Sequence, residues 1–525
     1  MKKIFWMFVV CLVAVNVGCS RGCLSSKGEE NTVRIRILSE PDSLDPQMTS
    51  TGDGSNDSIF LFEGLFAVHP EKGVAPALAE RWTVSEDGRV YTFHLRKDAY
   101  WSDGKPVTAE DFIYAWTRAA DPKTGSPQAT RLQYVKNGAA FFEGKLTDPS
   151  QLGFKALDSY TIQLETEGFF PPIFELLSTP TLAPVRKDII EKFGDRWTRA
   201  ENIVTNGPFL LKEWKTMEKL VFIKNPNYWD KENVHLEKVE ALIIEDQETA
   251  LKRYLAGEIE FLEALPEAKI STLKERDDFH PSETFGIYYY PLNTKIPSLS
   301  DPKVRRALSF AIDRKAIADN ILHNGQKPAT GWLPPGVEGY PYSTDLVGFN
   351  PEEAKRLFAE AGFPEGKGFP TLNIKYNTME MHKQIAENIQ QMWKKNLGID
   401  VKLLNQEWKA HVAALQNHDF EVARLAGIGE YIYPSTFLEG DITGAPGNYS
   451  QWSNAQFDEL WEKAKKTTTR EEQLKIYAEM EKIFLSEMSS IPIYFYADSW
   501  MAKTYLKGIH LTPLHKFTFK YVKKE

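Results

Sequence analysis

The chain has 525 residues, which exceeds the size of one ordinary hydrophobic core and predicts two or three lobes. Hydrophobic residues make up 42% of the chain and aromatic residues 12%, so extensive disorder is excluded. The formal net charge is −9, and this acidic excess argues against nucleic acid as a partner, because phosphate binding needs clustered Lys and Arg.

The first residues have the order of an export signal. Lys2 and Lys3 precede an apolar run from Ile4 to Val15. This run is shorter than the about 20 apolar residues that cross a bilayer, and no later stretch approaches that length. We therefore expect a signal peptide over residues 1–18 and an exported mature chain without a transmembrane helix.

The residues after the apolar run, Gly18-Cys19, are similar to the end of a bacterial lipoprotein signal, in which the Cys becomes the lipidated first residue. This similarity implies lipidation of Cys19, with a lipid anchor and tether over residues 19–30. Ordinary signal cleavage near Cys19 or Cys23 is the alternative. All three Cys lie before residue 24, so the folded body has no disulfide, no Cys-ligated metal and no thiol nucleophile.

Strands and helices are mixed along the rest of the chain, which predicts an α/β fold. Alternating apolar residues predict strands over Val33–Leu38, Arg89–Leu95, Thr161–Leu164, Leu220–Ile223, Lys238–Ile244, Ile399–Leu404 and Ile491–Tyr496. Capping residues predict helices that begin after Thr108, after Asp301-Pro302 (as far as Leu322) and after Asn350-Pro351. Apolar stripes and helix-ending residues predict further helices over Glu248–Ala256, Ile385–Leu397, Ala455–Lys466 and Arg470–Glu487.

Motifs of the common enzyme classes are missing from the sequence. H-E-x-x-H, G-x-S-x-G and G-x-x-x-x-G-K-[ST] do not occur. His411 and His418 are spaced for one helix face, but surface or loop His is the commoner case, so we expect no metal and no cofactor. A pair of carboxylates acting as a glycosidase acid and base stays open, because only coordinates show their separation. We expect a protein that is not an enzyme, with an exported hydrolase as an alternative.

Residues Leu78–Pro122 have the sequence LAERWTVSEDGRVYTFHLRKDAYWSDGKPVTAEDFIYAWTRAADP. This block resembles the signature region of the peptide/nickel-type solute-binding proteins that supply ABC importers. Further segments resemble the oligopeptide-binding members of that family, in the same order along the chain: Ser39–Met48 with Phe62–Phe66, Thr205–Trp214 with Asn225–Asp230, Tyr288–Arg314, and Tyr376–Lys409. The resemblance covers nearly the whole mature chain.

The resemblance implies a two-lobed, periplasmic-binding-protein-like fold of the large, extra-domain type, with hinge strands and an interlobe ligand cleft. It implies a discontinuous first lobe over residues 31–61, 186–285 and 498–525, a side domain over 62–185 packed on it, and a second lobe over 286–497. It also implies a monomer, periplasmic or on the cell surface, that binds short peptides in extended form. Closure on the peptide would precede delivery to the permease subunits of an ABC importer, whose ATPase subunits are separate chains.

The resemblance also implies roles for particular residues. Glu430 takes the Asp position of the family's D-Y-x-x-P-x-x-F-L motif and is expected to pair with the α-ammonium of a peptide. Arg424 is expected to bind the C-terminal carboxylate, with His382 as a second candidate; Arg is the stronger partner because its planar fork matches a carboxylate. The other expected ligand-binding residues are Gly52, Tyr254, Trp408, Gly427, Ile428, Gly429 and Tyr496.

Three departures from the family pattern keep other ligands open. Glu430 replaces Asp, Gly427 replaces Trp, and Leu415 replaces an Arg of the peptide- and murein-peptide-binding members. A non-peptide or modified-peptide solute, such as a nickel chelate, an opine, a sugar or a murein peptide, is the alternative ligand, although Leu415 counts against acidic murein peptides. A surface adhesin or signalling receptor on the same fold is a further alternative.

Overall fold

The computed structural model describes residues 31–342 and 346–525. The expected signal peptide, the lipidated Cys19 and most of the tether lie outside these ranges. None of the helices within them is long and apolar enough to cross a membrane.

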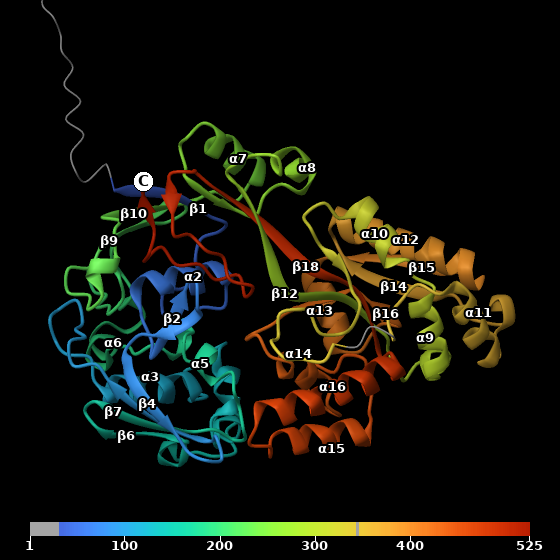
Figure 1. The fold of residues 1–525 in the computed structure, drawn as a ribbon, viewed down its shortest axis with the longest axis horizontal. Coiled ribbons are helices and arrows are strands. Elements are labelled where there is room, and N and C mark those ends of the chain that lie inside the picture. The colour runs from blue at the N-terminus through green and yellow to red at the C-terminus, as the bar shows by residue number, and fades with distance from the viewer. Residues whose placement is uncertain (1–30, 343–345) are drawn as a thin grey trace, which may run out of the picture.

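Two long antiparallel strands join the two halves of the molecule (Figure 1). β12 spans Phe279–Pro291 and β18 spans Ser490–Ala502. The ladder between them shifts register between Glu283 and Ile287. On one side of this irregularity β18 also pairs with β11, and on the other side β12 also pairs with β17. The irregularity therefore lies where the pair passes from one half to the other.

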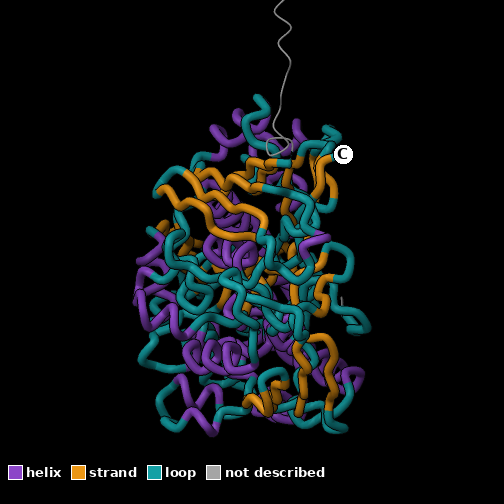
Figure 2. The backbone as a smooth tube through the Cα atoms, turned by 90° about the vertical axis from the view of Figure 1, so that its left-hand side faces the viewer, coloured by secondary structure: helices purple, strands orange, loops and turns teal. Residues whose placement is uncertain are grey.

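The first lobe is built on one end of a large sheet with the strand order β17-β12-β18-β11-β1-β10-β9-β8. β1 runs parallel to β10 and β11, and the predicted alternation is confirmed, because Val33, Ile35 and Ile37 are all buried. Its other strands and helices are β1 (Thr32–Ile37), β8 (Phe209–Lys215), β9 (Lys219–Lys224), β10 (Lys238–Ile243), β11 (Phe261–Glu263), α2 (Gly52–Leu61), α7 (Gln247–Leu255) and α8 (Ile270–Leu273). Figure 2, which faces this side of the molecule, shows strands at the top and loops over much of the middle.

A smaller unit packs beside the first lobe, at the lower left of Figure 1. Its antiparallel sheet has the order β4-β5-β7-β6, and a separate pair is formed by β2 and β3. Its elements are β2 (Phe66–His69), β3 (Gly73–Pro76), β4 (Ala79–Val84), β5 (Val90–Leu95), β6 (Phe154–Asp158), β7 (Thr161–Glu165), α3 (Ala109–Ala120), the 3₁₀ helix η1 (Ala129–Tyr134), α4 (Gly138–Phe142), α5 (Ile173–Leu176) and α6 (Lys187–Phe193). We call this group of elements the side unit.

The second lobe lies to the right in Figure 1 and contains a parallel sheet with the order β15-β14-β16. Its strands are β13 (Lys327–Pro328), β14 (Leu372–Asn377), β15 (Val401–Gln406), β16 (Val422–Ala423) and β17 (Leu425–Ile428). Its helices are α9 (Pro302–Phe310), α10 (Arg314–Ile321), α11 (Pro351–Glu360), α12 (Glu380–Leu397), α13 (Trp408–Gln416), α14 (Ser435–Leu438), α15 (Ala455–Ala464) and α16 (Arg470–Glu487). Two short strands, β19 (Leu506–Lys507) and β20 (Lys523–Lys524), pair near the C-terminus.

The prediction of one helix after Asp301-Pro302 is wrong, because the segment forms two helices, α9 and α10. The Asp313 side chain accepts a hydrogen bond from the Ala316 N–H at 2.9 Å and so begins a second helix. The buried Arg314 guanidinium donates to the carbonyl oxygens of Ser309 and Ile312 in the break, which satisfies groups that a continuous helix would pair internally. The apolar periodicity continues through the break, so the sequence pattern did not indicate where the first helix ends.

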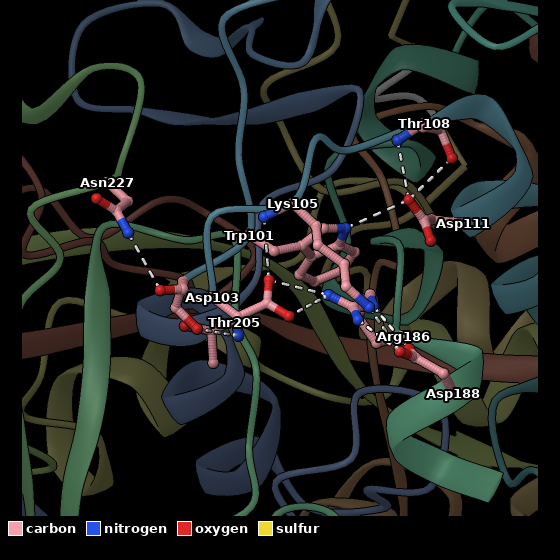
Figure 3. Close-up of polar contacts among 10 residues, drawn as sticks. Trp101, Asp103, Lys105, Thr108, Asp111, Arg186, Asp188, Thr205 and Asn227 are labelled. Carbon is pink, nitrogen blue, oxygen red and sulfur yellow. Dashed lines mark hydrogen bonds and ion pairs between the residues drawn. The ribbon is translucent and has the colours of Figure 1, made fainter.

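Residues of the block Leu78–Pro122 form polar contacts within the side unit and also with Thr205 and Asn227 outside it (Figure 3). The Arg186 side chain is 5% exposed and donates to both Asp103, at 2.9 and 3.0 Å, and Asp188, at 2.6 and 2.7 Å. The indole of the buried Trp101 donates to Asp111, which also accepts from the Thr108 N–H at 2.8 Å and so confirms the predicted helix start. The charged groups around Arg186 are paired with one another, so they are not available to a ligand.

Arg186→Met should lower the free energy of unfolding by about 2 kcal/mol, because it leaves Asp103 without its bidentate partner in a part-buried position. Urea unfolding followed by tryptophan fluorescence measures the change. The matched control is Lys187→Met, since Lys187 lies next in the chain and its ion pair with Glu191, at 3.7 Å, is exposed. Equal effects of the two substitutions would contradict a structural role for the Arg186 network.

Candidate functional site

β17 is an edge strand of the large sheet and pairs, among the described strands, with β12 alone. The Gly429 N–H donates to the Phe285 carbonyl at 2.8 Å, and residues 425–428 continue this antiparallel register. Since ladder bonds alternate along such a strand, Leu425 and Gly427 point their backbone groups at β12, whereas Ala426 and Ile428 point theirs away from it. The free side of β17 can therefore accept an extended chain as an additional strand.

Gly429 is needed where β17 ends. A Cβ atom at this position would lie 2.5 Å from the ring of Phe285, closer than atoms can approach. A Cβ at Gly427 would lie 3.6 Å from Phe437, which is an ordinary contact. Two of the predicted ligand-binding glycines thus differ: Gly429 is dictated by the approach of β12, whereas Gly427 leaves space that a side chain could occupy.

Arg424 immediately precedes β17 and is buried, with 8% of its surface exposed. One Nη donates to the Tyr496 hydroxyl at 3.1 Å and the other to the Asn377 amide oxygen at 3.2 Å, and the guanidinium lies 4.6 Å above the ring of Tyr288. Its Nε is buried and has no hydrogen-bond partner, and no acidic side chain of the described residues forms an ion pair with it. Arg424 is therefore a buried cation that no acidic side chain of the described residues neutralises.

His382 is buried beside Arg424, with its Nδ1 3.3 Å from the Tyr288 hydroxyl. Burial, together with the charge of Arg424, lowers the pKa of His382 to about 3, so its imidazole is neutral at physiological pH. It can take part in a hydrogen bond but carries no charge, so Arg424 is the charged member of this pair. The Nε2 of His411, which was considered above as a metal ligand, lies 2.8 Å from the Arg424 carbonyl oxygen. The described residues contain no cluster of three metal-ligating side chains.

Glu430 lies just beyond the other end of β17, and half of its side chain is exposed. Its carboxylate pairs with Arg131, which belongs to η1 of the side unit, so this ion pair links the side unit to the second lobe. Arg131 is held in turn by Gln128, whose side-chain oxygen accepts from its Nε at 2.7 Å. Sequence reasoning missed Arg131, because nothing in the local pattern of η1 indicates a partner so far along the chain.

The structure brings some, but not all, of the remaining predicted ligand-binding residues close to β17. Tyr496 contacts Arg424 directly, and Trp408 begins α13 with half of its surface exposed. Gly52 is the first residue of α2 in the first lobe. Tyr254 is fully buried inside the first lobe, where its hydroxyl donates to Asp278 at 3.0 Å within a separate apolar cluster. Tyr254 therefore contributes to the core of the first lobe and is not brought together with Arg424 and Glu430.

A cavity of about 610 Å³ lies between the side unit and the second lobe and is lined by Glu430. From the side unit it is lined by residues of η1 and of the segment 167–170, and from the second lobe by the segments 430–447 and 461–477. A cavity of this size can hold a small ligand or part of a larger one.

The sequence and the fold match known proteins over most of the chain. Residues 73–449 match the model of the family described as bacterial extracellular solute-binding proteins, family 5, and the chain belongs to this family. The periplasmic oligopeptide-binding protein OppA of Escherichia coli (strain K12) is 36% identical, with 91% of this chain and 90% of that protein covered.

Two solved structures are similar over nearly their whole length. The murein tripeptide-binding protein MppA, in its unliganded open form, has a TM-score of 0.80 and 36% identity, with 94% of this chain and 98% of that chain covered. Haemophilus influenzae OppA, in a complex with the peptide RPPGFSPFR, has a TM-score of 0.77 and 32% identity, with coverages of 94% and 99%. These matches confirm the predicted two-lobed α/β fold.

Arg424→Met should change the free energy of unfolding of the ligand-free protein by less than about 1 kcal/mol, because the substitution removes a buried charge that lacks an acidic partner. The control is Arg314→Met, which removes an equally buried guanidinium that donates to several main-chain oxygens and should cost about 3 kcal/mol. Urea unfolding without ligand compares the two. A large loss for Arg424→Met would show that Arg424 is kept for stability.

Proposed function

We propose that this chain is the extracytoplasmic substrate-binding component of a peptide ABC importer. The observation that carries the proposal is the free edge of β17, which has an unneutralised cation, Arg424, before its first residue and a carboxylate, Glu430, after its last. A short peptide in extended form has the same layout: backbone donors and acceptors along its length, and opposite charges at its two ends. The edge would bind the main chain of such a peptide whatever its side chains.

Distances along the strand agree with a short ligand. β17 has four residues, and at about 3.4 Å per residue it matches a peptide of about four residues. The C-terminal carboxylate would meet the fork of Arg424, with the neutral His382 beside it, and the α-ammonium would meet Glu430. Trp408, Gly427 and Tyr496 would then be contacts of the peptide's middle and C-terminal part.

The proposal includes where the protein works and with which partners. The chain would be exported, anchored in the membrane through lipidated Cys19, and monomeric, and it would deliver peptides to permease subunits whose ATPases are separate chains. The relatives named as periplasmic peptide-binding proteins support this setting. The lobe boundaries inferred from the resemblance belong to the proposal too, and the irregularity between Glu283 and Ile287 supports a boundary near residue 286. No cofactor and no catalytic step are part of it.

Glu430→Ala should weaken the binding of tetra-alanine by about tenfold or more, because it removes the counter-charge of the α-ammonium. N-acetyl-tetra-alanine, which has no ammonium, should be affected less than about twofold in the same variant. Losing the Glu430–Arg131 ion pair should change the affinity for both peptides by the same factor, so it does not alter the ratio of the two affinities. Isothermal titration calorimetry gives both affinities, and an equal loss for the two peptides would remove Glu430 from this role.

Arg424→Met should weaken the binding of tetra-alanine at least about tenfold while leaving the weaker binding of its C-terminal amide nearly unchanged, because only the free acid carries the charge that Arg424 neutralises. The same calorimetric titrations measure this. The prediction fails if wild-type protein binds acid and amide equally well, or if the substitution weakens both to the same extent.

A further inference from the structure

We infer that the interlobe cavity beside Glu430 is a subsite for a basic side chain, Lys or Arg, on the first residue of the bound peptide, with Glu439 as its counter-ion. The inference rests on the proposed function, because it places the peptide's N-terminus at Glu430. It adds a preference among peptides that the free edge of β17 does not by itself provide.

Glu439 is a carboxylate without a cation. Its two oxygens lie 2.9 and 2.7 Å from the Tyr134 hydroxyl, which donates to it across the lobe interface. No Lys, Arg or His of the described residues forms an ion pair with it. The cations that line the same cavity are already committed, since Arg131 pairs with Glu430 and Lys465 pairs with Glu462 at 2.6 Å. A ligand cation entering the cavity would therefore find Glu439 as its partner.

The walls of the cavity suit a cation with an alkyl stem. Tyr134 stacks on Phe170 with ring centroids 4.1 Å apart, and Tyr431 packs edge-on against both rings. The aromatic residues that line the cavity are Tyr134, Phe169, Phe170, Tyr431, Trp461 and Tyr477. Ring faces attract ammonium and guanidinium groups and also cover the methylene groups that carry them. A carboxylate among aromatic rings is thus complementary to a Lys or Arg side chain.

The cavity lies beside the proposed position of the α-ammonium, so the side chain that enters it would be that of the first peptide residue. Glu430 belongs both to the lining of the cavity and to the end of β17 where the α-ammonium is placed. The side chain nearest to that ammonium is the one on the same residue. Glu430 and Glu439 line the same cavity, so one peptide residue can present its ammonium to Glu430 and its side chain to Glu439.

The ionisation of Glu439 gives the subsite a pH dependence. Burial, and then the nearby charge of Glu430, raise the pKa of Glu439 to about 7, while the hydrogen bond from Tyr134 opposes this shift. Below that pH the carboxyl is neutral and offers a basic side chain no charge; above it the carboxylate is ionised. The other titratable groups that line the cavity are Arg131, Tyr134, Glu167, Glu430, Tyr431, Lys465 and Tyr477. Preference for a basic side chain should therefore rise between pH 6 and pH 8.

The test uses two tetrapeptides that differ by one ammonium group: Lys-Ala-Ala-Ala, and its analogue with norleucine in place of Lys. Wild-type protein at pH 8 should bind the Lys peptide about tenfold more tightly, measured by calorimetry, and the ratio should be smaller at pH 6. Glu439→Gln should reduce the ratio at pH 8 to less than about twofold, because it weakens the binding of the Lys peptide far more than that of the norleucine peptide. Glu479→Gln, an exposed acid on the same helix as Tyr477, should keep the ratio.

The outcomes separate this inference from the proposed function. If wild-type protein binds neither peptide, the proposed function fails. If it binds both equally at pH 8, peptide binding stands and the basic subsite is overturned, whatever the variants do. If Glu439→Gln weakens both peptides equally, Glu439 acts on the peptide backbone or on lobe closure, and the subsite is again overturned.

Discussion

The antiparallel pair of β12 and β18 is the feature on which the rest of the structure depends. It joins the two lobes, and it also supplies the rings around Arg424: Tyr288 comes from β12 and Tyr496 from β18. The edge strand β17 is attached to the same β12. The strands that connect the lobes and the free edge of β17 therefore belong to one continuous sheet. Under the proposed function, a peptide that bound the closed arrangement more tightly would favour closure.

Charge is distributed unequally over the two ends of β17. Arg424 is buried, and no acidic side chain of the described residues pairs with it. Glu430 is half exposed and already paired with Arg131 of the side unit, so a ligand ammonium would share an existing interlobe contact. Contacts of Ile432 with Glu175 and of Tyr431 with Tyr134 cross the interface at the same end.

Local chemistry made much of this fold predictable. The Thr108 cap, the Pro at the start of α9, the Gly398 that ends α12, and the apolar alternation of β1 are short-range signals, and each corresponds to the element that forms. The break between α9 and α10 was not predictable from periodicity, because what stabilises it is a buried Arg314 bonded to the distant Pro492 carbonyl.

The residues of the site also differ in whether the sequence indicates them. Arg424 and Glu430 were indicated by a motif that lies within one stretch of sequence, and the structure places them at the two ends of one strand. Their partners Tyr288, Asn377 and Arg131 come from other parts of the chain, and no local pattern indicates them. Tyr254, by contrast, was indicated by its position in the family pattern but is buried in the interior of the first lobe. The unpaired state of Glu439 likewise depends on which residues surround it in space.

Binding of a peptide main chain to the free side of β17 can be measured by residue-resolved hydrogen exchange with and without tetra-alanine. We expect the amides of Ala426 and Ile428 to become protected on peptide addition, whereas those of Leu425 and Gly427, which point to β12, are protected already and change little. Peptide binding that leaves the Ala426 and Ile428 amides exchanging as fast as before would contradict it.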